Sequence, residues 1–124
     1  MEVVIQMELF PRTNRQDIQA ARSLLNRYLR MRKTSELLLQ KEGITDKEKQ
    51  VAEEYKQKAD AIQMAVRMIM DDEVRRVMEY RFIKGYPRWG TVRHFSNITD
   101  RSVDRRIDKG IESVAETLKL IGII

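Results

Sequence analysis

The sequence contains no cysteine, and only two prolines and five glycines occur in its 124 residues. Without cysteine there can be no disulfide and no thiolate metal site, a pattern that fits a reducing cytoplasm. No run of eighteen apolar residues occurs, and Glu2 stands where a signal peptide would be basic. We therefore expect neither export nor a membrane span, and the expected location is the cytoplasm.

Residue types for catalysis are equally scarce. His94 is the only histidine, and there is no glycine-rich phosphate loop. Carboxylates are plentiful, but they stand among lysines and arginines without forming a motif. The sequence therefore predicts no enzyme, no cofactor and no metal site.

Positive charge is in modest excess, with 24 lysines and arginines against 19 acidic residues. The excess is concentrated between Lys84 and Lys109, where seven basic and three acidic side chains occur. Such a patch permits a polyanionic partner such as DNA without proving one.

Residues 1–70 predict an arm followed by two helices that pack side by side. Pro11 forbids helix just before it, so the arm of residues 1–13 is expected to be non-helical. Asn14 or Thr13 can cap a helix running to about Lys41, and Thr45 with Glu48 can start the next. The second helix has an apolar seam near seven-residue spacing: Val51, Tyr55, Ala59, Ile62, Val66 and Ile69. A short connection makes this an antiparallel helical hairpin for packing or oligomerisation, with Met64, Met68 and Met70 as gap-fillers against the rest of the chain.

Residues 71–124 predict three further helices. Asp72 can cap a helix that stops at Gly85, and Trp89 opens a short helix in which we expect its ring to be a core anchor. The last helix carries one apolar stripe: Val103, Ile107, Ile111, Val114, Leu118 and Ile121. Gly110 lies within this last helix at a local cost, which a close approach by another helix would explain.

The break between the last two predicted helices, Phe95 to Asp100, is short enough to require a sharp turn. Asn97 is expected in the left-handed conformation there, and Thr99 is expected to cap the last helix. The pattern is that of a helix-turn-helix, although an ordinary helical hairpin in a bundle would look similar. Opposite the apolar stripe lie Arg101, Arg105 and Asp108, with Ser102 and Lys109 along one edge. Arginine favours nucleic acid, because its planar fork pairs with guanine edges or phosphates.

Several of these residues also carry a resemblance. Tyr80-Arg81-Phe82, Gly85, Trp89, Ser96-Asn97-Ile98-Thr99, Val103 and Ile107 resemble region four of bacterial sigma factors, a helical module that reads promoter DNA. The whole chain, with Phe10-Pro11 ahead of a helix bearing Leu25-Asn26-Arg27-Tyr28, is similar to phage transcriptional regulators of the ArpU and RinA type. The resemblance implies major-groove contacts by the residues after the turn: Asp100, Arg101, Ser102, Asp104 and Arg105. With the basic residues of the patch, Arg88, Arg93 and Lys109, they form the predicted DNA-binding site.

The prediction is therefore an all-α protein, with an N-terminal hairpin segment (1–70) and a C-terminal helix-turn-helix domain (71–124). It would bind double-stranded DNA as a transcriptional regulator and as a homodimer, with RNA polymerase as a further candidate partner. Two alternatives stay open: a small terminase subunit for DNA packaging, and a protein that docks on RNA polymerase or a sigma factor without touching DNA. Candidate dimer surfaces are Leu37 to Leu39, the three methionines and Leu9-Phe10.

Overall fold

The computed structural model describes residues 12–124, and these form helices and turns without a β-strand. The elements are α2 (Arg15–Gln40), α3 (Asp46–Arg67), α4 (Asp72–Met78), the π-helical segment η1 (Glu79–Ile83), α5 (Arg88–His94) and α6 (Asp100–Leu120). The predicted all-helical class is confirmed for this part of the chain. Most of the expected arm, with Leu9 and Phe10, lies outside the described residues.

α2 begins where Asn14 satisfies its free amides. The Asn14 side chain accepts from the Asp17 N–H at 2.9 Å, and the Asp17 carboxylate accepts from the Asn14 N–H at 3.0 Å. This reciprocal pair is a capping box, which identifies Asn14 rather than Thr13 as the cap. α2 ends one residue before Lys41, and Gly43 then turns the chain at a φ of 66°, a conformation that favours glycine.

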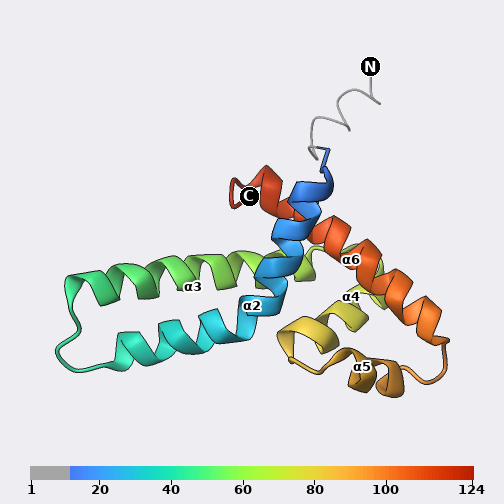
Figure 1. The fold of residues 1–124 in the computed structure, drawn as a ribbon, viewed down its shortest axis with the longest axis horizontal. Helices are drawn as coiled ribbons and strands as arrows, with labels where there is room; N and C mark the ends of the chain where they lie inside the picture. Colours follow the sequence, from blue (N-terminus) through green and yellow to red (C-terminus); the bar gives the residue numbers. More distant parts are fainter. Residues whose placement is uncertain (1–11) are drawn as a thin grey trace.

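α2 and α3 lie side by side over the C-terminal part of α2 (Figure 1). Thr45 caps α3 with Glu48 as its reciprocal partner, as the sequence predicts. Lys41 donates to Glu48 at 2.6 Å across the connection. This bond from Lys41, together with the bonds to Thr45, lowers the pKa of Glu48 to about 2. Of the predicted seam, Ala59, Ile62, Val66 and Ile69 are buried and Val51 and Tyr55 are half-buried, with Ile69 lying beyond the last residue of α3.

The cap of α4 differs from the prediction by one residue. Asp71, not Asp72, accepts from the amides of Glu73 and Val74, at 2.9 and 3.2 Å. Asp72 is the first helical residue and pairs with Arg75 instead. The reason is geometric, because only the residue before the first turn can reach the second and third free amides of a helix.

α4 continues directly into the wider π-helical segment η1 before the helix stops. The Lys84 N–H donates to the Glu79 carbonyl at 2.8 Å, five residues back, which is the spacing of a π-helix. Gly85 then takes a φ of 83°, which confirms the predicted stop. A Cβ at Gly85 would also require the end of the exposed Leu29 side chain of α2 to move, but the positive φ is the feature that favours glycine there.

α6 is the central element, because it contacts α2, α3, α4 and α5. Its predicted stripe is buried as far as Leu118, whereas Ile121 lies past the helix end and is exposed. Gly110 lies against Met78 of α4, so the predicted close approach by another helix is confirmed. Arg106 is only 22% exposed because it reaches across to Glu73 of α4 and pairs with it at 2.8 Å.

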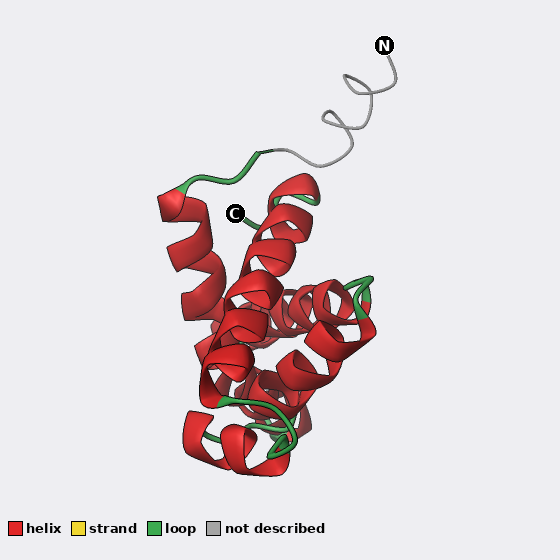
Figure 2. Ribbon diagram, turned by 90° about the vertical axis from the view of Figure 1, so that its right-hand side faces the viewer, coloured by secondary structure: helices red, strands yellow, loops and turns green. Residues whose placement is uncertain are grey.

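One hydrophobic core runs through residues from both halves of the sequence, from Ala21 on α2 to Leu118 on α6. The start of α2 lies beside the end of α6 (Figures 1 and 2). Lys119 fixes this junction by donating to Asp17 at 2.8 Å and to the Arg12 carbonyl at 2.9 Å. The bond from Lys119, followed by that from the Asn14 amide, lowers the pKa of Asp17. Within the described residues, no helix has the length and apolarity needed to cross a membrane.

Candidate nucleic-acid interface

The predicted DNA-binding residues lie on α5, on the first two turns of α6 and, for Lys109, on its third turn. α6 starts at the predicted cap, where the Thr99 hydroxyl oxygen accepts from the Ser102 N–H at 3.1 Å. Val103 and Ile107 point into the core from the same two turns. Since the inner face is fixed, residues on the opposite side of these turns must face solvent.

The turn between α5 and α6 is built differently from the prediction. Asn97 is not left-handed, since no non-glycine residue in the described part of the chain has a positive φ. Phe95 carries the change of direction instead, with φ −96° and ψ 46° at the end of α5. The Ile98 N–H then donates to the Phe95 carbonyl at 3.1 Å and closes the turn. A backbone that stays at negative φ throughout has no need of a residue that tolerates the left-handed region.

A two-bond ion pair joins α5 to α6. Arg88 donates through Nε to one oxygen of Asp104 at 2.8 Å and through Nη2 to the other at 2.7 Å. Both hydrogen bonds hold the pKa of Asp104 below its ordinary value, and they raise the pKa of Arg88. This planar geometry fixes orientation as well as distance, so the first turn of α5 is held against the second turn of α6.

The other end of α5 is held by a column of rings. The Tyr80 ring stacks on Tyr86 with centroids 4.3 Å apart and on His94 with centroids 4.0 Å apart. Because the Tyr86 and His94 rings are both nearly parallel to Tyr80 at these short distances, they must lie on opposite faces of the Tyr80 ring. The Phe95 ring meets Tyr80 edge-on at 5.7 Å. His94 is exposed, but its ring packs against Tyr80 of η1.

The ring column was not predicted from the sequence, although a signal was present. Five of the eight aromatic residues lie between positions 80 and 95. Such a cluster indicates an aromatic assembly, but its stacking depends on how η1 turns Tyr80 toward α5.

The predicted site residues fall into two groups in the structure. Arg88 and Asp104 bind each other, and Ser102 is half-buried with its Oγ 2.9 Å from the Thr99 hydroxyl. The remaining five are exposed and, among residues 12–124, form no ion pair or side-chain hydrogen bond: Arg93, Asp100, Arg101, Arg105 and Lys109. Asp108, on the same side of α6 as Arg101 and Arg105, pairs weakly with Arg22 of α2 at 3.7 Å.

Trp89 is not the core anchor that the sequence predicts. Its side chain is 65% exposed, whereas Thr91 is the fully buried residue of α5 and Val92 and Phe95 are half-buried. Two residues correspond to about 200° of rotation on a helix, so Trp89 lies nearly opposite Thr91. The indole therefore projects from the outer surface of α5.

The methionines are also more exposed than predicted. Met64, Met68 and Met70 are 42%, 46% and 94% exposed, so the gap-filler prediction is wrong. In the connection after α3 it is Ile69 that takes the inward position, which leaves Met68 and Met70 outside. These two side chains border a cavity of about 420 Å³ that opens between the connection and α6.

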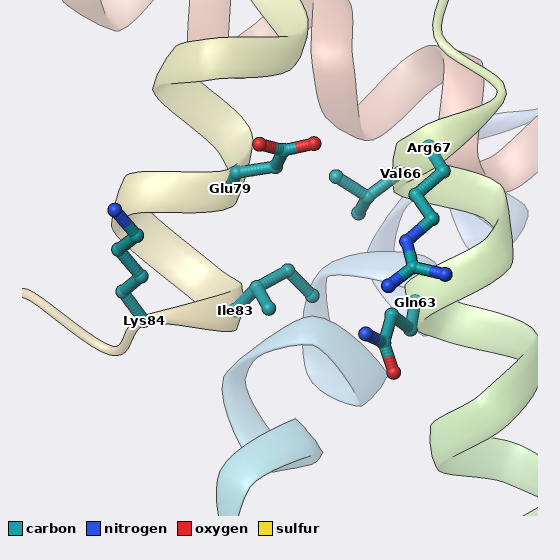
Figure 3. A pocket seen from close by; sticks show the side chains of 6 residues that line it. All are labelled: Gln63, Val66, Arg67, Glu79, Ile83 and Lys84. Carbon is teal, nitrogen blue, oxygen red and sulfur yellow. The ribbon is translucent and has the colours of Figure 1, made fainter.

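A smaller pocket, of about 170 Å³, lies between α3 and η1 (Figure 3). Arg67 on one side and Glu79 on the other give its lining charges of both signs. Over residues 12–124, histidine, aspartate and glutamate form no cluster of three that could hold a metal ion.

Comparison with known proteins does not identify a family: the chain matches no family model, no curated protein and no solved structure. The resemblance to sigma region four and to the phage regulators therefore stays a prediction.

Proposed function

We propose that the protein is a sequence-specific regulator of transcription that binds double-stranded DNA through a helix-turn-helix made of α5, the turn and α6. The α2–α3 segment is an antiparallel hairpin that supports this unit. The observation that carries the proposal is that Arg101 and Arg105 are exposed and unpaired within the described residues. They lie one turn apart on the exposed side of the first two turns of α6, and no acidic partner binds them among the described residues.

The lack of an acidic partner for these two arginines is informative, because several other arginines form ion pairs. Arg32, Arg75, Arg76 and Arg106 each pair with a carboxylate within 3.0 Å or less. An arginine fork without a partner is available for the edge of guanine or for a phosphate. A helix of this width fits the major groove, with its N-terminal residues nearest the bases.

The proposed roles follow from the contacts. Arg101 and Arg105 read bases, while Arg93 and Lys109 bind phosphates on either side. Arg88 and Asp104 have a different role, because their mutual bonds fix the angle between α5 and α6. Ser102 helps to cap α6 through the Thr99 hydroxyl.

The salt dependence of binding tests whether phosphates are contacted. A duplex is first selected from a random-sequence library on the full-length protein. Its affinity is then measured by fluorescence anisotropy at several salt concentrations. We expect log affinity to fall linearly with log salt with a slope of about −3 to −6, because each neutralised phosphate releases counterions. Affinity that is unchanged between low and physiological salt would remove the case for DNA binding.

Single substitutions separate base readout from phosphate contact. Arg105→Ala should cost about 1–3 kcal/mol on the selected duplex and relax the preference at one base pair. Lys109→Ala should weaken all duplexes about equally. Arg67→Ala is the matched control, since Arg67 is also exposed and has no ion pair within the described residues but belongs to α3. An equal and uniform loss for Arg105→Ala and Lys109→Ala would rule out base readout by Arg105.

The assembly in solution distinguishes the three functions considered. We propose a homodimer, because one recognition helix covers few base pairs and a second half-site supplies the missing affinity. Leu37 and Leu39 on α2, 59% and 44% exposed, are available for such a contact. Sedimentation of the full-length chain should give a dimer mass. A large ring would favour DNA packaging, and binding to RNA polymerase without affinity for DNA would favour the docking role.

A further inference from the structure

The exposed indole of Trp89 needs an explanation that folding does not provide. It is the only tryptophan in the chain, and 65% of its side chain is exposed although it lies in the first turn of α5. A large aromatic side chain that contributes little to the core is typical of a contact surface.

Trp89 lies next to a contact that joins α5 to α6. Arg88, the preceding residue, is bound by two hydrogen bonds to Asp104 of α6. Pro87 before it fixes the backbone, and its carbonyl accepts from the Thr91 hydroxyl at 3.0 Å. The backbone that carries the indole is therefore tied, through Arg88, to Asp104 of α6. Asp104 lies in the sequence between Arg101 and Arg105.

The charge around Trp89 selects the kind of partner. Two of the three acidic residues between Lys84 and Lys109 are already paired, Asp104 with Arg88 and Asp108 with Arg22. What is left in this region is mainly positive, which favours an anionic partner. The partner must also offer an apolar surface to the ring. Duplex DNA offers both along each strand, as phosphates and as the flat faces of deoxyribose.

We infer that Trp89 is a second DNA contact, which packs its ring on a sugar and donates its indole N–H to a phosphate beside the groove that α6 enters. This inference rests on the proposed DNA binding and adds to it a contact from α5. An aromatic ring and a single N–H donor suit this position, because together they fix the register of the backbone without reading a base.

The fluorescence of the chain reports on Trp89 alone when tryptophan is excited selectively. Titration with the selected duplex should change its emission and protect it from acrylamide. Both effects should saturate at the DNA concentration that saturates anisotropy of the labelled duplex. Anisotropy that rises while the emission and acrylamide quenching stay constant would overturn the Trp89 contact and leave DNA binding intact. If neither signal responds to DNA, the proposed function fails, and the inference fails with it.

Two further comparisons test whether Trp89 contacts something other than duplex DNA. Emission that changes with protein concentration in the absence of DNA would place Trp89 in a contact between copies of the chain. A larger change with the single strand than with the duplex would assign it to stacking on unpaired bases. Either result would overturn the inference.

Substitutions give an independent readout. Trp89→Ala should weaken duplex binding by up to about tenfold, which is the lower end of the range for stacking on bases, and Trp89→Phe should lose less. Leu120→Ala is the matched control, because Leu120 is 46% exposed at the opposite end of α6. Thermal unfolding of each variant checks the fold, which a substitution at this exposed position should leave intact. Affinity of Trp89→Ala equal to that of the control would contradict the contact.

Discussion

Gly110 provides a direct test of how α6 is seated on α4. A methyl group added at Gly110 would overlap the Cγ and Sδ atoms of Met78, more closely than real Cβ contacts allow. Met78 is fully buried, so its side chain has no route into solvent. Against this, replacing a helical glycine by alanine contributes about 1 kcal/mol of helix stability. Overpacking of a core costs about 1–3 kcal/mol, so we expect Gly110→Ala to be destabilised by up to about 2 kcal/mol.

The sign of the effect should depend on Met78. Met78→Ala alone should cost about 2–5 kcal/mol, because it leaves a cavity in the core. In that background the new methyl group has space, so adding Gly110→Ala should recover about 1 kcal/mol. Urea unfolding followed by circular dichroism gives all four free energies. A stabilised Gly110→Ala single variant, or the same effect in both backgrounds, would refute the packing of α6 against Met78.

Two further predictions concern charged pairs. The pKa of Glu48 is about 2 against an ordinary 4.5, so the stability from its pair with Lys41 is present above pH 4.5 and is lost as the pH falls toward 2. The difference in urea midpoint between the parent and Glu48→Gln should shrink over that interval; a constant difference would contradict the pair. For Arg88 and Asp104, a double-mutant cycle should give a coupling of about 0.2–1 kcal/mol that falls with added salt, as for exposed ion pairs. No coupling at low salt would show that the two-bond pair does not form in solution.

Local features of the fold could be predicted because their causes lie within a few residues. Thr45 and Thr99 cap helices through amides three residues ahead, and Gly85 marks the predicted stop at a positive φ. The buried stripe of α6 follows equally from spacing. These features depend on chain geometry that a short window of sequence contains.

The errors concern side chains whose surroundings come from distant parts of the chain. The sequence spacing places Trp89 on one helical stripe with Val92 and Phe95, yet α5 is oriented so that Thr91 points inward instead. The candidate site was affected in the same way. Exposed arginines could be named from the sequence, but Arg88 finds its acidic partner sixteen residues ahead. The tertiary structure therefore determines which basic residues remain available for an anionic partner.

α2 has a consequence for the energetics of the whole chain. Its N-terminal part packs on α6, its C-terminal part packs on α3, and one core joins both. Since α2 packs on both α3 and α6, an opening that separates α2 exposes parts of both halves of the chain. The most slowly exchanging amide hydrogens of the two halves should therefore share one opening free energy. Under the proposed function, a destabilising substitution in α3 would thus reduce the population of chains able to bind DNA. The occupancy of the proposed DNA site would then follow the folding equilibrium of the entire molecule.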